Sequence, residues 1–202
     1  KDTYDPETIE RELEWSAELG MNLHRVYLHN LLWDQDSLGF LKRLENYLKI
    51  SDSKKIKTLF VLLDDCWHPA PKLGKQPDPT PFVHNSQWVQ APGALILGDS
   101  LRHKELKNYV KGVMSHFADD KRVVGWDLYN EPGNEALNLK GHNKFEIKEN
   151  KHIYTLSLLK KTFKWAREVN PSQPITTSIW KASGEDKNWS KLDSLSDLYR
   201  FA

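Results

Sequence analysis

The spacing of the apolar residues changes repeatedly along the chain, and this alternation limits the possible folds more than any other feature. Ile9, Leu13 and Ala17 recur every four residues, which indicates one apolar face of a helix. Ile56 to Leu63 is instead a short continuous apolar run, typical of a strand buried on both faces. The two patterns alternate four times, starting with a helix. Such alternation predicts an α/β fold with a parallel sheet and right-handed crossovers.

Capping residues mark where the predicted elements begin and end. Asp5-Pro6 opens the first helix and Gly20 closes it, while Asn170-Pro171 ends the last. The remaining helices are predicted to begin at Asp36, at Asp99 or Ser100, and near Lys151. Strands are predicted at Met21 to Leu28, Ile56 to Leu63, from Val123 onward, at Pro174 to Trp180, and as a possible start at Ser196 to Ala202.

The bulk properties favour a single domain over residues 1–202 and exclude several classes of function. With 29 basic and 28 acidic side chains, the net charge of +1 gives no reason to expect a nucleic-acid partner. No apolar run is long enough to span a membrane. The single cysteine excludes an internal disulfide. The histidines lack metal-site spacing and no phosphate or dinucleotide loop occurs, so neither a metal nor an organic cofactor is predicted.

The segment from Val123 to Pro132 carries the clearest candidate for chemistry. Its apolar residues predict a buried strand, which ends in the polar pair Asn130-Glu131. Pro132 then stops the strand because it has no N–H to donate. In an α/β barrel, a carboxylate at the carboxyl end of a strand lies where active sites are found. A strand that merely ends in a polar turn is the simpler interpretation.

The run Trp126-Asp127-Leu128-Tyr129-Asn130-Glu131-Pro132 resembles the fourth strand of the clan of retaining (β/α)8 glycosidases, which includes the cellulase-like glycoside hydrolase family 5. The resemblance implies a TIM (β/α)8 barrel that cleaves β-glycosidic bonds of a poly- or oligosaccharide by double displacement. It implies that Glu131 is the general acid/base and that Asn130 binds the sugar 2-hydroxyl. The carbohydrate substrate is then the expected partner, with no cofactor.

Two residues of the first predicted strand are further candidates for substrate binding. In the resembling clan, an Arg on the second strand hydrogen-bonds the nucleophile, and Arg25 matches that position. Arg25 could instead pair with another carboxylate of the barrel. His29 falls at the end of the strand, where it could contact substrate or serve as a structural hydrogen-bonding residue.

Later segments add four candidates for contacts with sugar. The related enzymes often place a His after the third strand, whereas this chain offers Asp65 and Trp67. Trp67 could be an aromatic platform for the apolar face of a pyranose. Residues 69–99 form a proline-rich loop containing His84 and Trp88, and we expect either a wall of the substrate cleft or a lid over the barrel. Trp180, at the end of its strand, is expected to line the cleft.

The number of strands predicts that the chain covers about strands two to six of a barrel. Eight strands and about 250 residues are usual for this fold. The chain starts on a helix, so counting one earlier strand places Glu131 on strand four, as the resemblance requires. The nucleophile of the clan, a Glu on strand seven, is then expected beyond Ala202, and no residue is assigned to it. If these residues were the whole polypeptide, open sheet edges would favour self-association; the sequence otherwise indicates no oligomeric state.

Other functional hypotheses remain open. The scaffold could bind carbohydrate without turnover, or it could host different chemistry, such as metal-dependent hydrolysis. Cellulase-like, mannanase-like and xylanase-like activities are all compatible with the sequence. A glycosidase of this type is expected to be secreted or periplasmic, although no signal peptide begins at Lys1.

Overall fold

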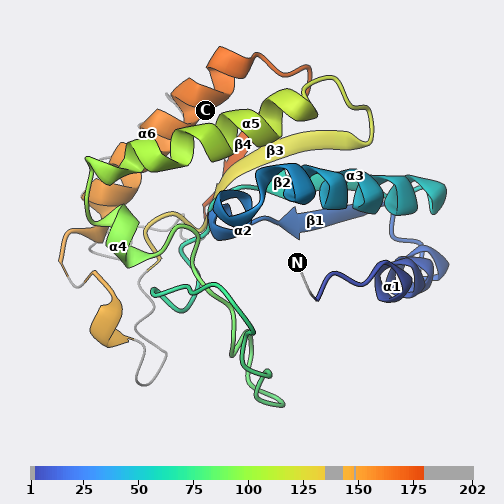
Figure 1. Cartoon of the computed structure of the whole chain (residues 1–202), viewed down its shortest axis with the longest axis horizontal. Coiled ribbons are helices and arrows are strands. Elements are labelled where there is room, and N and C mark those ends of the chain that lie inside the picture. Colours follow the sequence, from blue (N-terminus) through green and yellow to red (C-terminus); the bar gives the residue numbers. More distant parts are fainter. Residues whose placement is uncertain (1–2, 135–142, 148, 180–202) are drawn as a thin grey trace.

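The predicted alternation produces one parallel sheet. The computed structural model describes residues 3–134, 143–147 and 149–179. Its strands are β1 (Leu23–Tyr27), β2 (Lys57–Val61), β3 (Val123–Asn130) and β4 (Ile175–Ser178). They lie side by side in chain order, and every neighbouring pair is parallel. The predicted α/β class is therefore confirmed (Figure 1), while the possible strand at Ser196 to Ala202 falls outside the described residues.

After the first helix, which precedes β1, the helices lie between consecutive strands, and their starts follow the predicted caps closely. Asp5 accepts hydrogen bonds from the backbone N–H groups of Glu7 and Thr8 and so caps the first helix, as expected. Asp36 caps another helix through Gly39 N. The last helix has the predicted bounds. In the described chain the α-helices are α1 (Pro6–Glu18), α2 (Asn30–Gln35), α3 (Ser37–Ser53), α4 (Ala94–Leu97), α5 (Lys107–His116) and α6 (Lys151–Val169).

Short helical segments account for the differences from the predicted elements. Helix α2 was not predicted, because it is only six residues long and fills the short interval between the strand and Asp36. The helix expected from Asp99 or Ser100 begins as the 3-10 turn η1 (Arg102–Leu106) and continues as α5. The loop expected after β3 contains a second 3-10 turn, η2 (Asn143–Phe145). No helix in the described ranges has the length and apolar character needed to cross a membrane.

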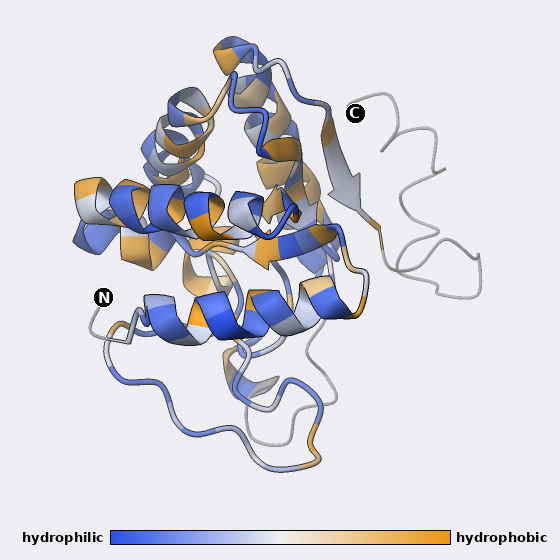
Figure 2. Cartoon of the chain, turned by 90° about the vertical axis from the view of Figure 1, so that its right-hand side faces the viewer, coloured by the Kyte–Doolittle hydropathy of each residue, from blue (hydrophilic) through white to orange (hydrophobic). Residues whose placement is uncertain are grey.

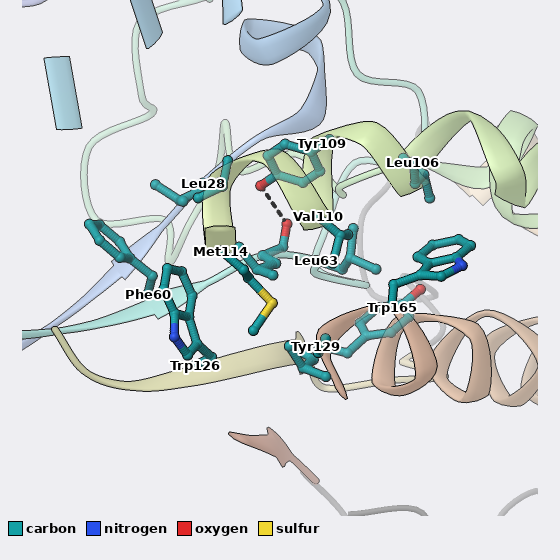
Figure 3. Packing of buried hydrophobic residues seen from close by; sticks show 14 of the residues in the cluster. Leu28, Phe60, Leu63, Leu106, Tyr109, Val110, Met114, Trp126, Tyr129 and Trp165 are labelled. Carbon is teal, nitrogen blue, oxygen red and sulfur yellow. Dashed lines mark hydrogen bonds between the residues drawn. The ribbon is translucent and has the colours of Figure 1, made fainter. Parts of the chain in front are cut away.

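Apolar side chains fill the space between the sheet and the helices α3, α5 and α6. The Phe60 ring on β2 lies 5.7 Å from the Trp126 ring on β3 and 6.1 Å from that of Phe117, which follows α5. Figure 2 shows apolar residues gathered where helices meet the sheet. Burying one such side chain contributes about 1.5–3 kcal/mol. In Figure 3 the buried Tyr109 hydroxyl donates to the carbonyl of Leu62, at 2.9 Å, so the core aligns α5 with the extension of β2.

The carboxyl ends of all four strands open on one edge of the sheet. From this edge the segment after β2 extends away from α5 and α6 (Figure 1). Two isolated bridges, Asp64 with Ala91 and His68 with Val89, hold the beginning and end of that segment together. The loop predicted at 69–99 is therefore anchored at its base, beside the end of β3 that carries Asn130 and Glu131.

Candidate active site

A bulge in β3 brings two polar side chains to the same face of the sheet. Asp127 pairs with Thr176 and Asn130 pairs with Ser178, so three residue steps on β3 match two on β4. In a regular strand Asp127 and Asn130 would point to opposite faces; the extra residue removes this difference. The guanidinium of Arg25 contacts both, with Nε donating to Asp127 Oδ2 at 3.1 Å and Nη2 donating to Asn130 Oδ1 at 2.8 Å.

The Asn130 amide is held in one orientation from both sides. Its Oδ1 accepts from Arg25, and its Nδ2 donates to Asp64 Oδ1 at 2.8 Å. Asp64 also accepts from the backbone N–H of Cys66 at 2.9 Å and from the indole N–H of Trp88. Burial raises the pKa of Asp64 to about 6, although these donors oppose the increase. The network fixes Asn130 directly beside Glu131.

The Glu131 side chain is positioned by its backbone and by two hydrogen bonds. Its φ of 46° lies in the left-handed region, which non-glycine residues adopt rarely and which is enriched at functional sites. Its N–H donates to the Ser178 carbonyl at 2.8 Å. Its Oε2 accepts from Asn134 Nδ2 at 2.7 Å and lies 3.0 Å from Cys66 Sγ. The turn therefore directs the carboxyl away from the regular path of the strand.

Glu131 opens into a pocket of about 270 Å³ formed largely by aromatic side chains. The rings of Tyr27 and Trp88 meet edge to face at 4.8 Å, and those of Trp67 and His84 do so at 6.1 Å. Among the described residues Glu131 is the only carboxylate in the lining. The pocket is lined by Tyr27, Cys66, Trp67, His84, Asn85, Trp88, Asn130 and Glu131. Aromatic surface beside one carboxyl group suits a ligand with apolar C–H faces and ether or hydroxyl oxygens.

Two larger hollows, of about 520 and 410 Å³, are both lined by residues of the 72–76 segment. Lys72 and Lys75 line both of them. Neither has a carboxylate among its described lining residues, so the smaller pocket at Glu131 is the candidate for acid–base chemistry.

Arg25 and His29 are placed differently with respect to this pocket. Arg25 pairs with Asp127 inside the barrel, the alternative considered from sequence, and it also orients Asn130. His29 caps α2: its Nδ1 accepts from Leu31 N at 3.1 Å and its Nε2 lies 3.0 Å from the Gln90 carbonyl. Burial lowers the pKa of His29 to about 4. Both ring nitrogens are used by the backbone, and His29 does not line the pocket.

Asp65 and Asp64 point to opposite sides of the chain. Asp65 was predicted to contact substrate, but its Oδ1 accepts from the Tyr129 hydroxyl at 2.7 Å, and its Oδ2 accepts from Gly133 N and from Thr155 of α6. Its side chain is thus turned toward the helix layer, where burial raises its pKa. Asp64, one residue earlier, takes the place that faces Asn130.

Of the other predicted site residues, two line the pocket and one lies outside the residues that the structure describes. Trp67 and His84 line the pocket, as does Trp88 from the same loop. Trp180 lies outside the described residues. Sequence reasoning missed Asp64, Asn134 and the contact between Cys66 and Glu131. Strand parity could have identified Asp64 only if the irregularity at the end of the strand had been known.

No metal-binding cluster was found among the residues that the structure describes, where three or more His, Cys, Asp or Glu side chains would have to converge.

The chain shares its fold with part of several solved glycoside hydrolase structures. The chain superposes on a β-glucosidase with a TM-score of 0.64 at 10% identity, covering 98% of this chain and 53% of that one. It superposes on an endo-1,4-β-mannanase from Rhizomucor miehei with a TM-score of 0.61 at 14% identity, covering 92% and 56%. The chain thus spans about half the length of these enzymes. No family model and no curated protein matches the sequence.

The comparisons support the predicted fold class and partial barrel. If the strands are counted as the resemblance implies, β1 to β4 correspond to barrel strands two to five, with Glu131 at the end of the fourth. The sequence identities are too low to carry the roles of individual residues, which depend on the local geometry.

Proposed function

We propose that this chain is part of a retaining β-glycoside hydrolase in which Glu131 is the general acid/base. One observation carries the proposal: the Glu131 carboxyl, at the carboxyl end of a central barrel strand, opens into an aromatic pocket next to an amide held by Arg25 and Asp64. The second amide hydrogen of Asn130 is the one assigned to the sugar 2-hydroxyl, because its Nδ2 makes only a long contact of 3.8 Å with Cys66 Sγ besides the bond to Asp64.

The chemistry requires Glu131 to donate a proton in the first step and to accept a different one, from water, in the second. In the first step the Glu131 acid protonates the glycosidic oxygen as the C–O bond breaks, and a second carboxylate bonds to the anomeric carbon. In the second step the Glu131 carboxylate removes a proton from water, which displaces that carboxylate and frees the sugar. The two carboxyl groups must be about 5–5.5 Å apart. The proposal assigns no residue of the described part to the nucleophile.

The test is hydrolysis of aryl β-glycosides and β-mannan by the full-length protein and by Glu131→Gln. Loss of a general acid typically reduces the rate by about 10²–10⁴-fold. The loss should be largest for substrates with poor leaving groups, which depend most on protonation. Glu12→Gln, on the exposed face of α1, is the matched control. Wild-type rates in Glu131→Gln would refute the assignment.

One observation favours carbohydrate binding without turnover as a second function. The described pocket contains aromatic rings and a single carboxylate, which is sufficient to bind a sugar but not for double displacement. Calorimetric binding of β-glucan or β-mannan oligosaccharides, with no reducing ends released by wild-type protein, would support it. For either function, a secreted or periplasmic location is part of the proposal, because polysaccharides are encountered there.

A further inference from the structure

The Glu131 carboxyl group accepts two hydrogen bonds, and both are made to the same oxygen atom. Asn134 Nδ2 donates to Oε2 at 2.7 Å, and Cys66 Sγ lies 3.0 Å from that atom. Within the described part of the chain, no group donates to Oε1. The two oxygens of this carboxyl group are therefore in different environments, although Glu131 faces a pocket that would otherwise offer them similar surroundings.

The two donors are themselves held by buried contacts. Cys66 is 4% exposed and its N–H donates to Asp64 Oδ1. Asn134 is 2% exposed; its N–H donates to the Glu131 carbonyl at 2.9 Å, and its own carbonyl accepts from the Lys151 ammonium. These contacts fix the backbone of both residues, and the two side chains also contact each other, with Asn134 Nδ2 3.3 Å from Cys66 Sγ.

The Cys66 thiol remains a donor across the range of pH in which a glycosidase works. Burial raises its pKa, and the charges of Asp64 and Glu131 raise it further. The sulfur therefore keeps its hydrogen and donates it to the carboxylate. A thiol in these surroundings is a poor nucleophile, because the thiolate is the reactive form.

We propose that Cys66 and Asn134 are positioning residues that hold Oε2 of Glu131 and reserve Oε1 as the atom that carries the transferable proton. This inference rests on the proposed acid/base role of Glu131. The amide of Asn134 has only hydrogens to offer at this contact, so Oε2 cannot carry a proton directed toward it. The acid form must place its proton on Oε1, and the carboxylate form is stabilised by two donors.

Other titratable groups surround Glu131 and must be separated from it in any pH experiment. Tyr27, Cys66 and His84 line the same pocket. Arg25 and Asp64 lie behind Asn130, and the pKa of Asp64, at about 6, falls in the working range. A readout specific to one group is therefore needed.

The S–H stretching band provides such a readout without any change to the donors. Residues 1–202 contain one cysteine, and subtraction of the spectrum of Cys66→Ala assigns its band in the full-length protein. We expect the band of the wild-type protein to lie at lower frequency than in Glu131→Gln, because a carboxylate is a stronger acceptor than an amide. An identical band in the two proteins would overturn the proposal.

Removing each donor in turn tests whether that donor acts on the Glu131 carboxyl group. The Glu131 carboxyl group is followed by carbon NMR on protein labelled at glutamate carboxyl carbons, with Glu131→Gln identifying the signal. In Cys66→Ala and Asn134→Ala the chemical shift of this signal should change, because one hydrogen bond to Oε2 is lost. Cys66→Ser should remain near wild type, since its hydroxyl can also donate. Asn22→Ala, at an exposed asparagine, is the control.

The same variants separate this proposal from the proposed function. If hydrolysis is present, kcat of the alanine variants should fall while KM stays near wild type, and Cys66→Ser should restore kcat, a pattern that a purely structural role would not produce. An unchanged Glu131 signal in both alanine variants would overturn the positioning roles. If the band and the carboxyl signal behave as expected but no glycoside is hydrolysed, the hydrogen-bond arrangement stands and the proposed function fails.

Discussion

Replacement of Lys151 by methionine should destabilise the fold strongly. The Lys151 and Glu146 side chains are both 0% exposed, and their charged atoms lie 3.0 Å apart. The ammonium also donates to the Asn134 carbonyl. Removing one partner of a buried ion pair typically costs about 3–5 kcal/mol, because the other charge remains buried without compensation.

The size of the effect can be converted into a melting temperature. For 202 residues, an unfolding entropy of about 2.1 cal/mol/K per residue gives about 0.4 kcal/mol/K in total. A loss of about 4 kcal/mol then corresponds to a decrease of about 10 °C in Tm. Thermal unfolding followed by circular dichroism measures it. The double variant Lys151→Met/Glu146→Gln should recover part of the loss, because position 146 then carries no buried negative charge.

Acidification should reduce the loss of folding stability that Lys151→Met causes. Burial raises the pKa of Asp65, and the Lys151 charge opposes that increase. Without Lys151 the pKa of Asp65 rises further above its unfolded value, so the penalty is present at high pH and is relieved as pH falls through the folded-state value.

An exposed ion pair provides the matched control for this experiment. Lys111→Met breaks the surface contact with Glu168 and should leave Tm nearly unchanged. A decrease of less than about 2 °C for Lys151→Met, or a double variant no more stable than the single one, would refute the reasoning.

Three further outcomes test other parts of the structure. Because burial lowers the pKa of His29 from 6.5 to about 4, wild-type stability should fall by about 3 kcal/mol as pH decreases through that interval, and urea titrations of His29→Asn should lack this loss. Gly112→Ala should cost about 1–3 kcal/mol, since its Cβ would lie 2.2 Å from the Trp33 ring; Gly112→Ala/Trp33→Leu should recover it. Asp65→Ala should lower the urea midpoint markedly, by leaving the Tyr129 and Thr155 hydroxyls without their acceptor, and an unchanged midpoint would contradict the buried network.

The arrangement of the sheet could be predicted from sequence because it depends on patterns that extend over many residues. The run from Ile56 to Leu63 and the one beginning at Val123 are too apolar to be placed at the surface, and Asp5 and Asp36 mark helix starts through local hydrogen bonds. Helix α6 has the predicted bounds because Asn170, in the left-handed conformation, ends it.

The details of the site depend on single-residue irregularities that leave no periodic signal. Regular alternation cannot show that Asp64, and not Asp65, faces Asn130, because the chain departs from strand geometry at that point. Asn134 and Cys66 meet at Glu131 although they come from different loops, and nothing in the sequence relates them. His84 and Trp88 of the 69–99 segment were easier to predict, since a loop that follows a parallel strand lies on the face where such folds bind ligands.

The bulge in β3 has a consequence for how such motifs are identified in other chains. Leu128 and Tyr129 occupy the interval in which β3 has one residue more than β4. A chain with the same Asn-Glu-Pro tripeptide but one residue fewer in that interval would keep its composition and its apolar character. It would nevertheless point either Asp127 or Asn130 away from Arg25, and the amide beside the glutamate would lose its orientation. The distance in residues from the last regular strand pair to the glutamate is therefore as informative as the tripeptide itself.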